Sequence, residues 1–424
     1  MRVLIVNTSE KTGGAAVAAR RLMEALNNNG VKAKMLVRDK ETQQITVAEL
    51  PGKLRQRWNF LWERWCLFFH LGFSRRHLFE LDQANTGQDI TQLPEFREAD
   101  VIHLSWINQG MLSLKGIRNI LRSGKAVVWT MHDLWPAAAI CHYARGCMAF
   151  KTECRRCQLL PRGGAARDLA NRVWHKKQAI YHNSGLHFVA CSRWLEDQAR
   201  QSGLLHNLFV TNIPNPIDTH VFCPKDKAAA RRALGLPAEG RLMLFVSQRV
   251  TDERKGIAYF IEALNLLMER CPDMKNDTSV VILGGHAEEV APSLPIKAYP
   301  LGYVNDDRQI AEVYNAADVF VLPSLEDNLP NTIMEALACG VPCVGFKVGG
   351  IPEMIDHRQN GYVAQPKNAA DLAEGIRWVL CEANGDNLRA AALHKVASRY
   401  SQRIVALQYI EVYNQALALK MCRL

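Results

Sequence analysis

Two carboxylates separated by seven residues, Asp327 and Glu335, lie in a stretch that could bind an anionic or polyhydroxylated ligand. The stretch, residues 317–350, begins with an apolar run at residues 319–322 that predicts a strand buried on both faces. A polar turn with Glu326 and Asp327 follows, and then a predicted helix that contains Glu335. Open α/β sheets bind ligands at the carboxyl ends of parallel strands, and helix N-termini favour anions. The spacing therefore predicts a ligand site here, although the carboxylates alone could equally be a solvated acidic loop.

Two cations, Arg249 and Lys255, lie six residues apart after another predicted strand at residues 242–247. Lys255 and Gly256 directly precede a predicted helix over residues 257–270. Cations beside a helix N-terminus can clamp a diphosphate and neutralise charge on it as it leaves. Exposed lysines are common, so this pair taken alone could also be solvated charge.

Two further candidate positions follow predicted strands in the first half of the chain. Gly13 and Gly14 open a helix after the first strand, so their backbone amides could face a diphosphate. Many α/β proteins have glycine there, and the absence of G-x-G-x-x-G counts against a dehydrogenase. His132 follows a strand at residues 126–131, where a histidine could face a ligand or could simply pack or cap.

Four cysteines occur within 17 residues, in the order Cys141, Cys147, Cys154 and Cys157, and they end in C-x2-C. Four thiolates can supply a closed tetrahedral site for structural zinc, which would hold a long irregular loop in place. Two disulfides or four unrelated reduced cysteines are the alternatives. Catalysis by such a metal is not expected, because four thiolates leave no open coordination position.

The segment at residues 53–79 combines aromatic residues at helical spacing with an excess of positive charge. Its apolar positions are Leu54, Trp58, Leu61, Trp62, Trp65 and Phe69. Its charged positions are six basic residues and one acid, namely Lys53, Arg55, Arg57, Arg64, Arg75, Arg76 and Glu63. The pattern is typical of a helix in a membrane interface, and we therefore predict contact with an anionic membrane surface. The alternative is an aromatic face packed on the protein itself.

Length and composition limit the number of domains, the location and the partners that the sequence allows. The chain has 424 residues, 48% of them hydrophobic and 22% charged, which allows two or three globular domains. No apolar run approaches the roughly 18 residues of a membrane span, and residues 1–7 do not resemble a signal peptide. The net charge of +10 suits nucleic acid, an anionic membrane or phosphorylated substrates, but no nucleic-acid-binding signature is present. We expect a cytoplasmic protein, or one peripheral on the inner face of the cytoplasmic membrane, with no nucleic-acid partner.

Several of these motifs together resemble those of family 4 glycosyltransferases of the GT-B fold. The Asp327–Glu335 spacing resembles the Glu-x7-Glu signature of that family, with Asp in place of the first Glu, so that Glu326 could share its role. The run RVTDERKG contains the Arg-x5-Lys-Gly pair, and TMHDLWP resembles the segment of the family histidine. The matching flanking positions are Ser324, Ala336, Ala338, Gly340 and Pro342. The resemblance is strongest over residues 205–380 and weaker before them.

The resemblance implies an α/β protein with two Rossmann-like, doubly wound domains that face each other across a cleft. The expected divisions are an acceptor-side domain at residues 1–218, a nucleotide-sugar domain at 219–400, and a C-terminal helix at 401–424 that crosses back to the first domain. The segment PNPID at residues 214–218 resembles the family crossing between domains, with Pro216 in place of glycine.

The resemblance also implies roles around the donor phosphates and the transferred sugar. Arg249 and Lys255 would hold the diphosphate and stabilise the leaving group. Gly13 and Gly14 would face the donor phosphates and the acceptor. His132 would contact the sugar and hold it for attack, so it joins Arg249 and Lys255 among the expected catalytic residues.

The remaining implied roles concern the ribose, the hexose and the base. Glu335 would accept hydrogen bonds from the ribose hydroxyls. Asp327, with the backbone amides of Asn328 and Leu329, would fix the hexose hydroxyls, and Asp327 counts as catalytic for that reason. Backbone near Tyr303 would meet the base. No cofactor is expected to be required for catalysis.

The expected function is a retaining transfer of a hexose from a nucleotide-diphosphate sugar to a hydroxyl of a glycan or lipid-linked glycan. The cysteine cluster resembles the branch that builds bacterial exopolysaccharide of the colanic-acid type. Alternatives are a nucleotide-sugar epimerase, a glycoside phosphorylase, or a degenerate protein that binds membrane or polymer.

Overall fold

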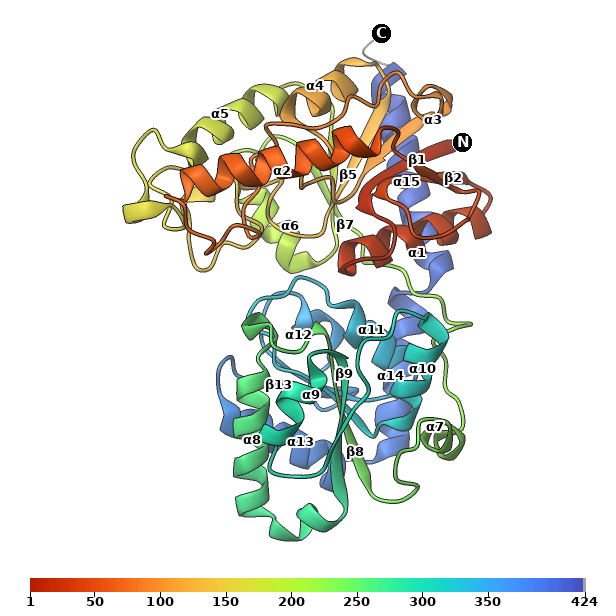
Figure 1. The fold of residues 1–424 in the computed structure, drawn as a ribbon. Coiled ribbons are helices and arrows are strands. Elements are labelled where there is room, and N and C mark those ends of the chain that lie inside the picture. The colour runs from red at the N-terminus through yellow and green to blue at the C-terminus, as the bar shows by residue number, and fades with distance from the viewer. Residues whose placement is uncertain (422–424) are drawn as a thin grey trace. The chain divides into compact units, whose positions relative to one another are not determined.

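The computed structural model describes residues 1–421, and it divides into two compact units (Figure 1). Unit 1 consists of residues 1–215 together with the chain from Val405 onward, and unit 2 consists of Pro216–Ile404. Each unit contains one sheet in which every strand pair is parallel.

Unit 1 has a seven-stranded sheet of order β3-β2-β1-β4-β5-β6-β7. Its strands are β1 (Arg2–Ser9), β2 (Lys32–Asp39), β3 (Val47–Glu49), β4 (Val101–Leu104), β5 (Ala126–Met131), β6 (His187–Ala190) and β7 (Phe209–Asn212). Its helices are α1 (Gly14–Asn28), α2 (Lys53–His70), α3 (Pro94–Glu98), α4 (Leu114–Arg122), α5 (Leu169–Tyr181), α6 (Arg193–Arg200) and most of α15 (Gln402–Met421). The strand order reverses between β1 and β4, which makes the sheet doubly wound.

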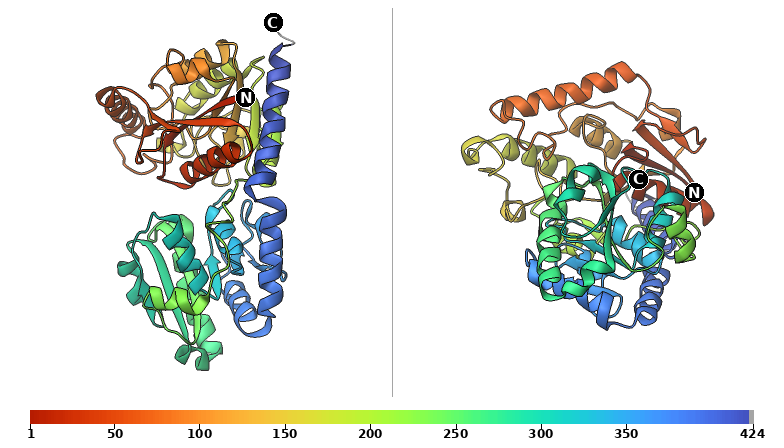
Figure 2. Two further views of the ribbon diagram at one scale, coloured as in Figure 1. Left: turned by 90° about the vertical axis from the view of Figure 1, so that its right-hand side faces the viewer. Right: turned by 60° about the horizontal axis from the view of Figure 1, so that its bottom comes forward.

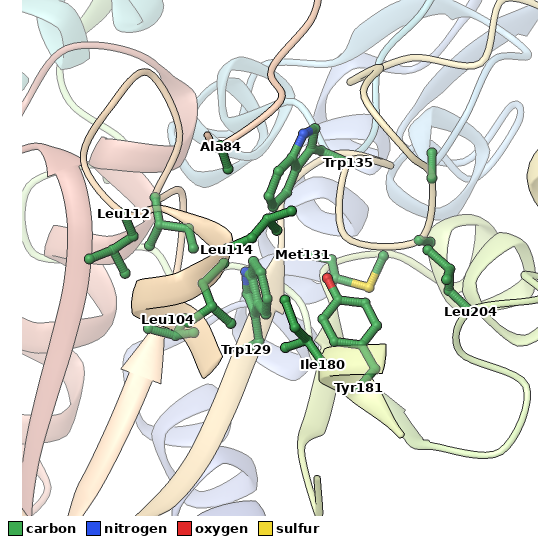
Figure 3. Close-up of a cluster of buried hydrophobic side chains, with 14 of the residues drawn as sticks. Ala84, Leu104, Leu112, Leu114, Trp129, Met131, Trp135, Ile180, Tyr181 and Leu204 are labelled. Carbon is green, nitrogen blue, oxygen red and sulfur yellow. The ribbon is translucent and has the colours of Figure 1, made fainter. Parts of the chain in front are cut away.

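Both faces of the unit 1 sheet are covered by apolar side chains. One core contains Trp129 of β5 together with Tyr181 of α5 and Phe188 of β6, and Figure 3 shows Trp129 and Tyr181 close together. The other core lies between the sheet and α1 and α15 (Figure 2). The Tyr413 hydroxyl of α15 lies 2.6 Å from Nδ1 of His103 in β4, and the Tyr409 hydroxyl lies 2.9 Å from Oγ1 of Thr130 in β5. These contacts hold α15 on unit 1.

Unit 2 has a six-stranded sheet of order β10-β9-β8-β11-β12-β13. Its strands are β8 (Arg241–Arg249), β9 (Thr278–Gly285), β10 (Ala298–Pro300), β11 (Val319–Leu322), β12 (Cys343–Phe346) and β13 (Gly361–Ala364). Its helices are α7 (Lys227–Ala233), α8 (Ile257–Arg270), α9 (Ala287–Val290), α10 (Asp307–Ala316), α11 (Asn331–Ala338), α12 (Ile351–Met354), α13 (Ala369–Arg377) and α14 (Gly385–Arg399). The order reverses between β8 and β11.

The prediction of two doubly wound α/β domains is confirmed, and so is the helix that returns to the first domain. The predicted strand at 242–247 needs correction, because β8 continues to Arg249, which is its last residue. None of the helices within residues 1–421 combines the length and the apolar composition that a membrane span requires.

The helix of the predicted amphipathic segment, α2, ends at His70, before the end of the 53–79 segment. Two of the charged positions of the segment, Glu63 and Arg64, are buried, at 0% and 6% exposure. Their partners lie later in the chain, so helical periodicity could not have located them.

Candidate functional site

The candidate site of unit 2 lies at the carboxyl ends of β8 and β11, where the strand order reverses. These two strands are neighbours, so the segments that follow them leave the sheet at the same edge. The segments are joined by a hydrogen bond from the Leu325 amide to the Arg254 carbonyl, at 2.8 Å. Gly256 has a φ of 75°, and a Cβ on it would lie 1.9 Å from the Pro323 carbonyl oxygen. Only glycine therefore permits this approach of the two segments.

Lys255 and Asp327 form an ion pair across these two segments. The Lys255 Nζ lies 2.6 Å from Asp327 Oδ2, and the two side chains are 19% and 12% exposed. Burial by itself would raise the pKa of Asp327, but the charges of Lys255 and Arg254 and hydrogen bonds from Lys255 and Ser324 hold it below its usual value. Arg254 also donates from Nη1 to the Glu326 carbonyl at 3.1 Å. Of the two acids in this loop, the carboxylate in contact with Lys255 is therefore that of Asp327.

The loop after β11 is fixed by backbone contacts. The Asn328 amide donates to Asp327 Oδ1 at 3.1 Å, and the Asn328 carbonyl accepts from the Gly350 amide at 2.7 Å. Gly349 has a φ of 53°, and a Cβ on it would lie 1.7 Å from the Asp327 carbonyl oxygen. Leu329 is buried at 7% exposure. The loop therefore presents the Asp327 carboxylate from a defined backbone conformation.

Glu335 lies on α11, and its carboxylate is positioned by Tyr314 of α10. The Tyr314 hydroxyl donates to Glu335 Oε2 at 3.0 Å, and Glu335 is 7% exposed. Burial, followed by the charge of Glu335, raises the pKa of the Tyr314 phenol, which keeps this donor protonated. The sequence assigned no role to Tyr314, because the motifs that indicate the site do not include it.

Arg249 and Tyr303 lie at the same carboxyl edge of the sheet. Within residues 1–421, no hydrogen bond or ion pair joins either of them to Lys255 or Asp327. Arg249 ends β8, is exposed, and donates from Nε to Thr251 Oγ1 at 3.1 Å. Tyr303 follows β10 and is 56% exposed. The unit 2 positions predicted from sequence therefore gather along one edge of the sheet, and the ion pair that the described residues show among them is Lys255 with Asp327.

In unit 1, Gly13 and His132 also follow strands of the sheet. Gly13 has a φ of 95° and precedes α1, and Gly14 is the first residue of that helix. His132 follows β5, with Nε2 2.8 Å from Ser105 Oγ and Nδ1 3.5 Å from Cys191 Sγ. Burial lowers the pKa of His132 to about 4, so its imidazole is neutral near pH 7.

A buried charged network beside His132 was not predicted from the sequence. His142 lies between two carboxylates, with Nδ1 2.7 Å from Asp133 Oδ2 and Nε2 2.8 Å from Asp82 Oδ2. Asp133 also accepts from Trp106 Nε1 at 2.9 Å, and Asp82 pairs with Arg64. Burial alone would lower the pKa of His142, but the two carboxylates outweigh it and raise this pKa to about 10. Asp82 and His142 are 60 residues apart in the chain, and no motif connects them.

The four clustered cysteines, Cys141, Cys147, Cys154 and Cys157, line one small cavity of about 30 Å³. They are free thiols, and burial raises the pKa of Cys154 to about 12. Within residues 1–421, no group of three or more His, Cys, Asp or Glu side chains is arranged to hold a metal ion. The fold therefore gathers the four predicted zinc ligands around one cavity, but it does not set them in coordination geometry, and the zinc site stays a prediction.

Two family models match the chain in succession. Residues 12–221 match "Glycosyltransferase Family 4", and residues 226–393 match "Glycosyl transferases group 1". An uncharacterized glycosyltransferase of Methanocaldococcus jannaschii is 32% identical over 201 residues, which cover 46% of this chain and 50% of the relative. A D-inositol 3-phosphate glycosyltransferase of Saccharomonospora viridis is 27% identical over 220 residues, covering 49% of this chain and 51% of the relative. The chain thus spans about half the length of these curated relatives.

Solved structures of similar fold cover almost the whole chain. Sucrose-phosphate synthase of Thermosynechococcus elongatus has a TM-score of 0.67 at 21% identity and covers 99% of this chain and 100% of its own. Anabaena HepE, solved in complex with UDP-glucose, has a TM-score of 0.65 at 17% identity, with 98% and 100% covered. Fold and family models therefore agree: this chain has the GT-B fold, and it matches a family 4 glycosyltransferase model over residues 12–221 and a group 1 glycosyltransferase model over residues 226–393.

Proposed function

We propose that this protein transfers a hexose, with retention of configuration, from a nucleotide-diphosphate sugar to a hydroxyl of a glycan or lipid-linked glycan. The observation that carries the proposal is the Lys255–Asp327 contact at the strand reversal of unit 2, with Glu335 on the following helix. A cation and two carboxylates at this edge suit a ligand that has both a diphosphate and free hydroxyls. The match to glycosyltransferase family models over both units supports the same reaction class.

The donor diphosphate is assigned to Lys255 and Arg249. Lys255 precedes α8, whose N-terminal amides and dipole favour an anion. As the bond to the sugar breaks, negative charge grows on the leaving phosphate, and preorganised cations stabilise that charge more than water would. The Lys255 ammonium exchanges Asp327 for phosphate when the donor binds.

The nucleoside and the hexose are assigned to the carboxylates. Glu335, oriented by Tyr314, accepts hydrogen bonds from ribose hydroxyls. Asp327, released from Lys255, accepts hydrogen bonds from the hexose hydroxyls, with the backbone of Asn328 and Leu329 beside it. Backbone near Tyr303 is assigned to the base, as the family resemblance implies.

His132, with Gly13 and Gly14, is assigned to the unit 1 side of the reaction. A neutral imidazole can accept or donate one hydrogen bond to a sugar hydroxyl without adding charge. The pKa of about 4 keeps His132 in that form near neutral pH. Ser105 and Cys191 contact its two ring nitrogens and set its orientation, so a sugar hydroxyl would replace one of these two contacts.

The transfer breaks the bond between the anomeric carbon and the phosphate oxygen and forms a bond from that carbon to the acceptor oxygen on the same face. The acceptor proton passes to the leaving phosphate oxygen, so the products are the glycoside and the nucleoside diphosphate. Because no side chain is identified as an enzymic nucleophile, we propose that this same-face route is the source of retention.

The setting we propose is bacterial cell-surface polysaccharide synthesis, and it rests on the resemblance of the cysteine cluster to exopolysaccharide enzymes. The names of the similar proteins indicate other products. One relative is a D-inositol 3-phosphate glycosyltransferase, and one protein of similar fold is a sucrose-phosphate synthase. Acceptor screening should therefore include lipid-linked glycans beside small phosphorylated polyols.

The test is release of nucleoside diphosphate from candidate nucleotide sugars, with and without acceptor, preceded by a thermal-shift screen of nucleotides. UDP-glucose is a natural first donor, because HepE was solved with it. Release that depends on acceptor supports a transferase. Epimerised nucleotide sugar without acceptor would indicate an epimerase, and release of a sugar phosphate from a glycoside would indicate a phosphorylase. A folded protein that binds no nucleotide would support a degenerate binding protein.

A further inference from the structure

The α2 helix turns its aromatic residues outward. Eight of the thirteen large hydrophobic side chains that are exposed in the described structure lie within residues 54–79. They are Leu54 (85% exposed), Trp58 (65%), Leu61 (50%), Trp62 (45%), Trp65 (57%), Phe69 (61%), Phe73 (60%) and Phe79 (62%). In both orientations of the molecule shown, α2 lies on the outside of unit 1 (Figures 1 and 2). We call this set of side chains the aromatic face.

The inner side of the same helix is largely polar. Its buried residues are Gln56, Asn59, Glu63, Arg64 and Leu67. In a water-exposed helix the hydrophobic effect favours the opposite arrangement, because burying a large apolar side chain stabilises the folded protein. The inverted arrangement therefore indicates that the aromatic face is covered by something apolar when the protein functions.

Specific contacts fix this orientation of α2. The Ala84 amide donates to Glu63 Oε1 at 2.7 Å, and Arg64 donates from Nη1 to the Leu78 carbonyl at 2.6 Å. A Cβ on Gly110 would lie 2.7 Å from the Asn59 carbonyl carbon, so this glycine allows the helix backbone to lie directly on unit 1. The helix cannot rotate its aromatic face inward without losing these contacts.

The charge around the aromatic face is positive. Arg55, Arg57, Arg75 and Arg76 are exposed and form no ion pair within the described structure, while Lys53 pairs with Glu49 at 3.1 Å. Glu63, which is the acid of the segment, is buried, and burial followed by repulsion from Asp82 raises its pKa to about 8. The exposed charge beside the aromatic rings is therefore almost entirely cationic.

A second segment lies next to the end of α2. A Cβ on Gly72 would lie 3.4 Å from Pro161, which places the loop around residue 161 beside the turn that follows the helix. Arg162, which follows Pro161, is exposed and adds a further positive charge near this end of the helix.

We propose that the aromatic face docks on an anionic phospholipid surface, with the rings in the interface and the arginines at the headgroups. Tryptophan and phenylalanine beside arginine suit this boundary, because the rings prefer the interfacial region and the arginine side chains are attracted to the anionic headgroups. A second copy of the chain is a poorer occupant, since a symmetric contact would bring the same cations together. The inference does not depend on the proposed transferase activity.

The experiment is co-sedimentation of the full chain with vesicles of phosphatidylcholine alone and of phosphatidylcholine with phosphatidylglycerol. The wild type is expected to sediment with the anionic vesicles, less so as salt rises, and weakly with the neutral ones. The variant Trp58→Ser/Trp62→Ser/Trp65→Ser is expected to reduce binding about tenfold or more, because three apolar anchors are lost. A control variant, Ile45→Ser/Phe209→Ser/Leu407→Ser, removes exposed apolar side chains elsewhere and should bind like the wild type.

Two further measurements distinguish membrane docking from self-association of the chain. Tryptophan fluorescence of the wild type should be quenched by brominated phospholipid in the anionic vesicles, and this readout needs no variant. The charge variant Arg55→Gln/Arg57→Gln should weaken binding, while Lys275→Gln/Lys367→Gln in unit 2 should not. Equal sedimentation of the tryptophan variant and the wild type would overturn the proposal. The proposal would also be overturned if the wild type did not bind anionic vesicles but formed a dimer, as measured by light scattering, that the three tryptophan substitutions abolish.

Discussion

Lys255 and Asp327 contact each other at 2.6 Å, although the family resemblance assigns one to the donor phosphates and the other to the sugar. Each side chain therefore balances the charge of the other. In the proposed function, a donor would replace this ion pair with two separate sets of contacts, so that Asp327 would compete with the phosphates for Lys255. Both side chains are largely buried, which makes the competition stronger than at an exposed pair.

Asp327→Asn should change nucleotide binding and turnover in opposite directions. Without the negative charge, Lys255 is released, and free nucleoside diphosphate should bind several-fold more tightly. Turnover with the nucleotide sugar should fall about tenfold or more, since a charged acceptor for the hexose is lost. Calorimetry and steady-state kinetics measure the two effects, with Asp277→Asn, at an exposed pair with Arg241, as the control. Weaker binding of the diphosphate to Asp327→Asn would contradict the competition.

Lys255→Ala and Glu335→Ala should each reduce turnover by about 10², by analogy with the loss of one preorganised polar group. Both variants should remain folded, as judged by unchanged circular dichroism. Full activity in both would show that the site lies elsewhere.

Tyr314→Phe tests the positioning of Glu335. The Tyr314 hydroxyl donates to Glu335 Oε2 at 3.0 Å, and a hydrogen bond to a charged group contributes about 1.5–3 kcal/mol. We expect KM for the donor to rise about tenfold, with a smaller change in kcat, because the ribose carboxylate loses its orientation. A control change at another tyrosine of unit 2, Tyr259→Phe on α8, should leave KM unchanged. A pure loss of thermal stability without any change in KM would leave Tyr314 with a packing role alone.

The buried His142 should make the protein less stable in alkali. The folded state raises the pKa of His142 to about 10, above its ordinary value of 6.5, so folding favours the protonated form. This contribution is complete below about pH 6.5 and is lost as the pH rises towards 10, by up to about 1.4 kcal/mol per pH unit. Glu63, with a pKa raised to about 8, loses its contribution as the pH rises from about 4.5 to 8.

The urea midpoint of unfolding should therefore decrease from about pH 7 to about pH 9. This decrease should be larger for the wild type than for His142→Gln, because glutamine cannot titrate. His206→Gln, at an exposed position, serves as the control. Parallel pH profiles for the wild type and His142→Gln would show that His142 is not held as a cation.

Zinc analysis tests the cysteine cluster. If Cys141, Cys147, Cys154 and Cys157 bind zinc, protein purified without chelators should contain about one zinc ion per chain, and chelation should lower its thermal midpoint. Cys154→Ser should lower both the zinc content and the midpoint. Cys381→Ser changes an exposed cysteine outside the cluster and should alter neither. Metal-free wild-type protein that is unaffected by chelators would remove the zinc site from consideration.

Local sequence signals, together with the family resemblance, predicted the doubly wound architecture and the candidate residues at the strand ends. Apolar strand runs, amphipathic helices and the residues that end them are local signals, and their alternation dictates parallel sheets. Because the carboxyl ends of parallel strands share one edge, the positions of Arg249, Lys255 and Asp327 could be predicted together. The aromatic and basic composition of α2 was equally evident.

Which side of α2 faces the protein depends on contacts that appear when the chain is folded. Glu63 and Arg64 are buried because their partners, Ala84 and Asp82, approach from a segment about twenty residues later. The same reason applies to Tyr314 beside Glu335 and to His142 between two distant carboxylates. A side chain becomes buried or charged through what packs against it, and helical or strand periodicity does not record partners that the fold brings from elsewhere in the chain.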